Sequence, residues 1–244
     1  MKFLYNILII CTLVTLVSCE NALGPQLDDT KTIKTETKWS VSPINKAKLH
    51  KVEEIKYNQN GKVINKFSYN EFGRIESSSS YEYENNKEIE TISEYSGDKV
   101  VKEITITSIL ENGLVVREEI KNDDGSVLDS KQFSYDNNGN IISIKSCNDN
   151  DDCDNTIKYD NVYDDGNLRV TYTINNNGDI SQKDSLVYQL ENNYFERITT
   201  DNNGNVYYIT GYKIDNSGRI VEEIIKNSNG LISKYYIYEF TYFE

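Results

Sequence analysis

Residues 135–141 read Tyr-Asp-Asn-Asn-Gly-Asn-Ile, and close variants of this stretch recur along the chain. Residues 57–63 read Tyr-Asn-Gln-Asn-Gly-Lys-Val, and residues 214–220 read Ile-Asp-Asn-Ser-Gly-Arg-Ile. The Asp or Asn side chain can accept hydrogen bonds from the backbone just ahead of it, and Gly adopts the positive φ that closes a tight hairpin. The repeated stretch therefore predicts a turn between two antiparallel strands.

Eleven of the 13 glycines mark such turns, at intervals of 12 to 16 residues or about twice that. They are Gly61, Gly73, Gly97, Gly113, Gly125, Gly139, Gly166, Gly178, Gly204, Gly218 and Gly230. Each long interval holds a substitute turn signal near its middle, at Asn85-Asn86, at residues 150–152 or at Asn192-Asn193. These 14 turns predict about 14 or 15 strands between residues 50 and 244.

The stretches between the turns alternate with a period of two, as half-buried strands do. Val127, Phe133 and Tyr135 face one way, around polar Ser130 and Gln132. We therefore expect an all-β protein, an elongated antiparallel meander of about 14 strands that forms either an open twisted sheet or a partly closed barrel. A transmembrane barrel is a third reading, which charges on both strand faces and the lack of aromatic girdles disfavour.

The recurring Tyr/Ile-Asx-x-x-Gly-x-Ile/Val motif resembles the YD repeat, also called the Rhs repeat, of bacterial wall-associated and toxin-delivery proteins. The resemblance covers most of residues 50–240 and is fullest around Gly61, Gly73, Gly139 and Gly218. In large members of that family, many repeats form a β-sheet shell around a toxic cargo. About seven repeat pairs are too few for such a shell, so the resemblance implies a shared building plan only.

The first 18 residues have the features of a secretory signal peptide. Lys2 supplies the positive end, residues 7–17 are apolar, and Ser18 is a small residue before Cys19. Residues 16–19, Leu-Val-Ser-Cys, resemble the lipobox of bacterial lipoproteins, which implies cleavage before Cys19 and lipidation of its thiol. The predicted organisation is a signal peptide over 1–18, a lipidated Cys and flexible tether over 19–49, and a YD-type repeat domain over 50–244.

Charge and hydropathy exclude two classes of protein. The formal net charge of −13 opposes binding to nucleic acid, which requires a basic surface. A mean hydropathy of −0.62, with no long apolar run after residue 18, excludes a protein of several membrane-spanning helices. The expected attachment to a membrane is the N-terminal lipid, and the expected state is a monomer.

Two cysteines remain once Cys11 is cleaved off and Cys19 is acylated. Cys147 and Cys153 are six residues apart, and in an exported protein this spacing predicts a disulfide that pinches one loop. The loop between them is rich in Asp, whose oxygens suit a hard cation, but it lacks the Gly and Glu of a calcium-binding loop. We expect a solvated acidic turn and no metal site.

The sequence offers no catalytic constellation. Glu118-Glu119 and Glu222-Glu223 are neighbours in predicted strands, so the two members of each pair point to opposite faces. His50 is the only histidine and has no Ser or Cys partner nearby in the sequence. We predict no enzyme activity and no cofactor.

Tyrosines provide the one predicted ligand surface, represented by Tyr207, Tyr212, Tyr235 and Tyr238. Tyrosine ladders can stack on sugars or on protein side chains, although cross-strand pairing for sheet stability explains them equally well. The predicted function is a non-catalytic, lipid-anchored protein of the outer membrane or cell surface that presents its sheet to a protein or glycan. The alternative is an immunity or accessory protein for a toxin in the envelope, since an acidic protein suits a basic partner.

Overall fold

The computed structural model describes residues 32–147, 153, 155–189 and 193–243, and in them the chain forms sixteen β-strands. The strands are β1 (Ile33–Val41), β2 (Lys48–Tyr57), β3 (Val63–Tyr69), β4 (Ile75–Glu84), β5 (Lys87–Ser96), β6 (Lys99–Glu111), β7 (Leu114–Asn122), β8 (Val127–Tyr135), β9 (Ile141–Cys147), β10 (Asn155–Asp164), β11 (Asn167–Ile174), β12 (Ile180–Gln189), β13 (Tyr194–Thr200), β14 (Val206–Ile214), β15 (Ile220–Asn227) and β16 (Ile232–Tyr242). No helix in this part of the chain is long and apolar enough to cross a membrane.

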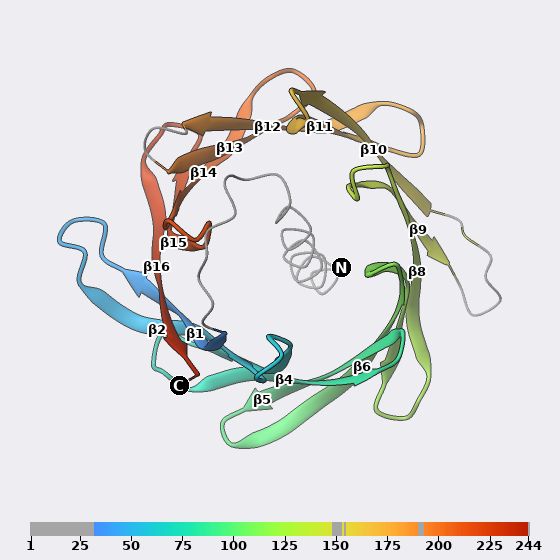
Figure 1. The fold of residues 1–244 in the computed structure, drawn as a ribbon, viewed down its shortest axis with the longest axis vertical. Coiled ribbons are helices and arrows are strands. Elements are labelled where there is room, and N and C mark those ends of the chain that lie inside the picture. The colour runs from blue at the N-terminus through green and yellow to red at the C-terminus, as the bar shows by residue number, and fades with distance from the viewer. Residues whose placement is uncertain (1–31, 148–152, 154, 190–192, 244) are drawn as a thin grey trace.

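The strands form one closed barrel (Figure 1). Each strand pairs antiparallel with the next in sequence, and β1 pairs with β16 to close the ring. The all-β antiparallel meander is thus confirmed, but the expectation of about 14 strands in an open sheet or a partly closed barrel is wrong. Closure satisfies the backbone groups that two free edge strands would have left unpaired.

The extra strand at the start of the barrel comes from residues predicted to be tether. β1 lies within the predicted tether of residues 19–49, and seven of its residues pair with β2. Its turn to β2 contains Pro43 and no glycine, so the glycine spacing did not reveal it. The tether prediction is wrong from Ile33 onward, while Cys19 and the predicted signal peptide lie outside the described residues.

Eight turns share one backbone geometry, which the Asx-x-x-Gly motif produces. In the turn at Asp136, the Asp136 amide donates to the Asn140 carbonyl at 2.9 Å, and the Gly139 amide donates to the Asp136 carbonyl at 3.1 Å. Gly139 has a φ of +80°, which an L side chain would strain. The same pattern recurs in the turns that begin at Asn58, Asn70, Asn122, Asn175, Asp201, Asp215 and Asn227.

Antiparallel order gives the barrel two distinct rims. The turns that precede the even-numbered strands all lie at one end, which we call the first rim. The remaining turns lie at the other end, the second rim, together with the start of β1 and the end of β16. The chain therefore enters and leaves the barrel at the second rim.

Strand register divides the side chains between two walls of the barrel. Residues paired across neighbouring strands share a wall, and Ile92, Ile104, Asp184, Thr199 and Tyr212 are buried on the same one. Side chains converge on the concave side of a closed sheet and diverge on the convex side, so this more buried wall is the inner wall. A small apolar core of Ile92, Ile104, Ile120 and Ile106 lies on its β5–β7 part.

Candidate functional site

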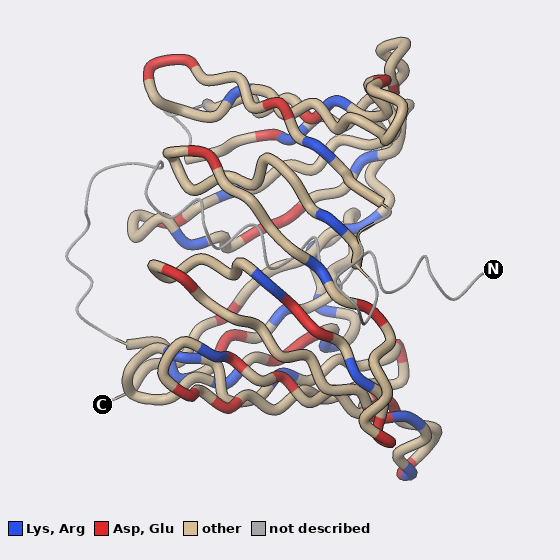
Figure 2. Tube along the Cα trace, turned by 90° about the vertical axis from the view of Figure 1, so that its right-hand side faces the viewer, with Lys and Arg blue, Asp and Glu red and all other residues tan. Residues whose placement is uncertain are grey.

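The outer wall carries charges along the length of its strands. Figure 2 shows acidic and basic residues spread along the strands as well as at their ends. Glu54 and Glu119 lie near the middle of β2 and β7, and Lys51 Nζ and Lys121 Nζ lie 2.7 and 2.5 Å from their carboxylates. The outer wall is therefore polar at mid-height.

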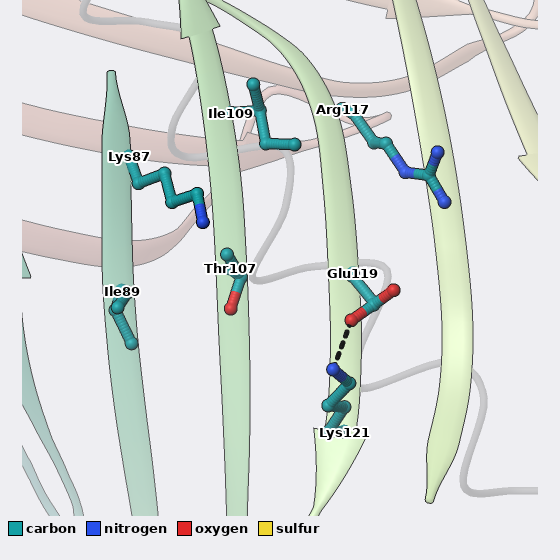
Figure 3. Close-up of a pocket in the computed structure, with 7 residues that line it drawn as sticks. All are labelled: Lys87, Ile89, Thr107, Ile109, Arg117, Glu119 and Lys121. Atoms are coloured by element: carbon teal, nitrogen blue, oxygen red, sulfur yellow. Dashed lines mark ion pairs between the residues drawn. The ribbon is translucent and has the colours of Figure 1, made fainter. Parts of the chain in front are cut away.

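A pocket of about 350 Å³ lies on this outer wall over β5, β6 and β7 (Figure 3). Its lining residues are Lys87, Ile89, Thr107, Ile109, Arg117, Glu119 and Lys121. Three of these are cationic and one is acidic, so the pocket has a net positive charge in an otherwise acidic protein. It contains none of the residues that the sequence singled out as a ligand surface.

The inner wall has a row of aromatic rings across β12, β13 and β14. The ring centroids of Tyr188 and Phe195 are 5.9 Å apart, and those of Phe195 and Tyr212 are 4.7 Å apart in a stacked arrangement. Burial raises the pKa of Tyr212 to about 12, and the charge of Glu223 adds to this effect. Because the rings cover one another's faces, this row is well suited to stabilising the wall.

A partly buried ion pair lies next to that row. The Arg197 guanidinium donates from Nη2 to Asp184 Oδ2 at 2.9 Å, and the Thr199 hydroxyl donates to Asp184 Oδ1 at 2.5 Å. Burial alone acts to raise the pKa of Asp184, but the hydrogen bond and positive charge of Arg197 outweigh it and lower the pKa. Asp184 is therefore held as a carboxylate.

The sequence alone does not reveal this ion pair. Asp184 follows the alternation of side chains between the two faces of its strand, but its partner Arg197 lies on β13, 13 residues later. The intervening connection has no glycine that would have fixed the register of the two strands. Only the tertiary pairing brings the two charges together.

Inner-wall acids also gather over β5 and β7. Burial raises the pKa of Glu118, and the nearby charge of Glu90 adds to this against the opposing charge of Lys131. Burial likewise raises the pKa of Glu88, again with a contribution from Glu90. Within the described residues, Glu118 Oε2 is a buried oxygen without a hydrogen-bond partner, while Glu90 accepts from the Tyr81 hydroxyl at 2.8 Å.

The seam at which β16 meets β1 has a third charged cluster on the inner wall. Lys38 Nζ lies 2.6 Å from Glu223 Oε2, and the Tyr238 hydroxyl donates to the same oxygen at 2.7 Å. The ammonium of Lys38 also lies 4.2 Å from the centroid of the Tyr236 ring. Burial, with the charge of Glu223, raises the pKa of Tyr238. The cluster ties the two ends of the chain together.

The four tyrosines proposed as a ligand surface do not share one wall. Tyr212 and Tyr238 lie on the inner wall with the rows just described. Tyr235 lies on the outer wall, where it is buried with its hydroxyl donating to Glu222 and with Lys46 Nζ 5.7 Å from its ring centroid. Tyr207 is exposed at the register shift near the start of β14. The four tyrosines therefore do not form one surface, because Tyr212 and Tyr238 lie on the wall opposite Tyr235.

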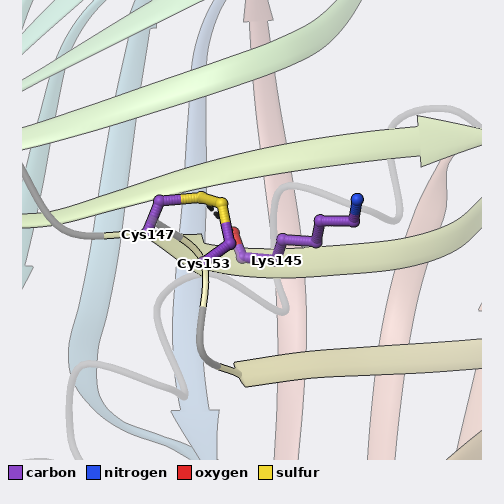
Figure 4. The surroundings of a disulfide bond; sticks show 3 residues. All are labelled: Lys145, Cys147 and Cys153. Carbon is purple, nitrogen blue, oxygen red and sulfur yellow. Dashed lines mark hydrogen bonds between the residues drawn. A yellow bond between two sulfur atoms is a disulfide. The ribbon is translucent and has the colours of Figure 1, made fainter. Parts of the chain in front are cut away.

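The structure contains the disulfide that the spacing predicted. Cys147 and Cys153 are bonded, with their Cα atoms 3.9 Å apart, at the turn between β9 and β10 (Figure 4). The Asp-rich segment between them, residues 148–152, lies outside the described part of the chain. No group of three His, Cys, Asp or Glu side chains in the described part is arranged to hold a metal ion.

The register separates the neighbouring acids as the alternation predicted. Glu118 pairs with Ser108 on the inner wall, and Glu119 pairs with Thr107 on the outer wall. Glu223 and Glu222 are separated in the same way by their pairing with Tyr236 and Ile237. Neither adjacent pair forms a carboxylate dyad, and His50 lies at the β1–β2 pairing opposite Ser40.

No protein-family model and no curated protein matches the chain. Among solved structures, a porin-like protein from Bacteroides uniformis ATCC 8492 is 12% identical over 86% of this chain and 98% of its own, with a TM-score of 0.47. A porin-like protein from Bacteroides vulgatus ATCC 8482 is 14% identical over 86% of this chain and 99% of its own, with a TM-score of 0.46. Both likenesses are too weak to carry an argument about fold or function.

Proposed function

We propose that this protein is a non-catalytic, lipid-anchored protein of the bacterial envelope, and that its barrel stands in water as a scaffold for interaction with a protein or glycan. The observation that carries the proposal is the polar outer wall. A barrel that spans a bilayer needs an apolar band there. This wall instead places charges such as Glu54, Glu119 and Lys183 along its strands.

The energetic argument favours water over lipid at the outer wall. A Lys or Arg on the lipid face of a membrane barrel costs about 2–4 kcal/mol at the bilayer midplane. The outer wall has Arg117, Lys145 and Lys158 within the middle parts of three separate strands. Such costs would accumulate over the wall, whereas exposed ion pairs in water cost little.

The inner wall supports a scaffold more than a catalyst. Asp184, Glu223 and Glu90 each accept hydrogen bonds from neighbouring side chains on the same wall. These bonds hold adjacent strands in register and engage the acids that general acid–base chemistry would require. We therefore expect the interaction surface at the ends or on the outer wall of the barrel.

The experiment that tests the anchor is metabolic labelling of cells with an alkyne fatty acid. We expect the full chain to take up the label, a Cys19→Ser variant to lose it, and a Cys153→Ser control to keep it. Label that persists without Cys19 would contradict the anchor.

The water-facing barrel is tested with the chain from Glu20 onward, exported behind a signal peptide without a lipobox. Every strand of the barrel lies within residues 33–242, so this chain contains the complete fold. We expect it to be released from the periplasm without detergent and to produce no conductance in a planar lipid bilayer. A chain that needs detergent to stay dispersed, or that opens channels, would contradict the proposal.

A further inference from the structure

Exposed apolar side chains gather at one end of the barrel. Of the 17 large apolar side chains that are exposed in the described residues, 13 lie at the first rim. They are Ile44, Leu49, Phe72, Ile75, Val100, Val101, Leu128, Ile157, Ile180, Tyr207, Tyr208, Leu231 and Ile232, and we call this set the apolar rim. Every even-numbered strand contributes at least one member within its first three residues, so the set encircles the barrel.

Among the described residues, the second rim has no comparable ring of exposed apolar side chains. The other four exposed apolar residues, Ile64, Ile142, Val162 and Val187, are scattered on four strands toward that end. Isolated exposed apolar residues are normal on protein surfaces, but a continuous set marks an interaction site. At the first rim, Ile44 is 96% exposed and Phe72 is 78% exposed. The two rims therefore differ in how many apolar side chains they expose.

We propose that the apolar rim is the interface between two copies of this chain, which meet rim to rim about a two-fold axis in the plane of the rim. The inference rests on the proposed function, because it requires the barrel to be surrounded by water and not by lipid. It replaces the expectation of a monomer.

The size of the rim suits such an interface. Sixteen strands spaced about 4.8 Å apart give a wall of roughly 77 Å around, and a sheet layer is about 10 Å thick. The annulus is therefore on the order of 800 Å² per copy, the area that a standard stable interface buries on each partner. A second copy presents an annulus of the same diameter and covers all the apolar positions at once.

Charge at the rim is complementary between its two arcs. The first-rim turns that follow β7, β11 and β13 have acidic Asp123, Asp124, Asp179 and Asp201 and no cation among the described residues. The first-rim turns of β1 to β6 instead have Lys46 and Arg74, with Lys48 and Lys99 as the first residues of β2 and β6, against Glu71 and Asp98. A two-fold axis between the arcs would bring the acidic arc of one copy against the basic arc of the other.

A bilayer fits the apolar rim less well than a second copy does. Asp123 and Asp124 lie at the tip of the turn before Leu128, so they would have to enter the bilayer before Leu128 could. Anionic head groups would also repel the acidic arc. In addition, the segment from Cys19 joins β1 at the second rim, at the opposite end of the barrel.

The test is sedimentation velocity of the chain from Glu20 onward, at micromolar concentration and without detergent. We expect a dimer, and we expect Phe72→Glu with Leu231→Glu to raise its Kd at least about thirtyfold, as loss of interface hot spots does. The matched control is Ile64→Glu with Val187→Glu at the second rim, which should leave the dimer intact. All four residues are exposed, and circular dichroism checks that the variants fold.

Three outcomes would overturn the inference while leaving the proposed function in place. The first is a well-dispersed monomer, and the second is a dimer that the second-rim variant breaks and the first-rim variant does not. The third is a monomer that floats with phosphatidylcholine vesicles and stops doing so in the first-rim variant, which would assign the apolar rim to a lipid surface. A chain that needs detergent to stay dispersed would instead contradict the proposed function itself.

Discussion

Among the described glycines, Gly211 has the least room for a side chain. A Cβ added there would lie 2.0 Å from the Tyr194 hydroxyl oxygen, so the ring lies where a side chain would otherwise stand. The Tyr194 hydroxyl donates to Glu196 Oε1 at 2.8 Å, and Lys226 Nζ lies 3.0 Å from the same oxygen. The glycine thus allows an aromatic ring to cover its strand and to align an ion pair.

Gly211→Ala should displace the Tyr194 ring and lower the free energy of unfolding by about 1–3 kcal/mol, the usual effect of overpacking. Chemical denaturation measures this value. In the double variant Gly211→Ala with Tyr194→Ala, the losses should be clearly less than additive because the clash is gone. Strict additivity would contradict the close approach.

Asp184 should lend stability that depends on pH. Its folded pKa is lowered, chiefly by Arg197 against the effect of burial, so its contribution is present above the unfolded pKa and is lost as pH falls through the folded value. Asp184→Asn should cost about 1–3 kcal/mol near pH 7, because it removes the charged acceptor of the half-buried Arg197 guanidinium. Thermal unfolding at several pH values measures both effects, and exposed Asp160→Asn on the outer wall of β10 is the control.

Glu118 should change the pH dependence of stability in the opposite direction. Its folded pKa is raised, mainly by burial, so the folded state holds the proton more tightly and stability increases as pH falls through the folded pKa. Glu118→Gln should therefore raise the melting temperature near pH 7 and change it little near pH 4. The control is Glu119→Gln on the outer wall, and an equal response from the two variants would contradict the wall assignment.

At the scale of the element, the hairpin turns are what the sequence predicts best. All eleven glycines chosen from their spacing have positive φ, as does Asn85 of the first substitute signal. These turns are local, since a few residues and their own backbone bonds define each one. The turn before β2 has no glycine to mark it, and for that reason β1 was assigned to the tether.

The turn at Asp136 should be more important to stability than the turn at Asn227. Both side chains cap their own turn with two hydrogen bonds from backbone amides. Asp136 also accepts hydrogen bonds from Tyr163 and Asn161, at 2.5 and 3.3 Å. Asn227→Ala should cost about 1 kcal/mol and Asp136→Ala about 2–3 kcal/mol, since bonds to a charged group are stronger. Denaturant titration of both variants measures the difference, and equal losses would contradict the added cross-strand role.

At the scale of the whole molecule, the sequence does not show that the sheet closes into a barrel. The turns fix which strands are neighbours along the chain, but β1 and β16 are paired across about 200 residues. Trp39 pairs with Ile237 in that seam, and nothing near either residue in the sequence points to the other. The wall that a tyrosine occupies likewise depends on the register between strands, which is why Tyr212 on β14 and Tyr235 on β16 face opposite sides.

The central claim is that the outer wall of a closed barrel faces water. The measurement that tests it most directly is spin-label power saturation on the full chain reconstituted in lipid vesicles, with single labels at Thr107→Cys and Ser185→Cys on the outer wall. We predict that a water-soluble nickel chelate relaxes both labels strongly and that molecular oxygen does so only weakly. Relaxation dominated by oxygen at both sites would show that the wall lies in lipid and would contradict the account.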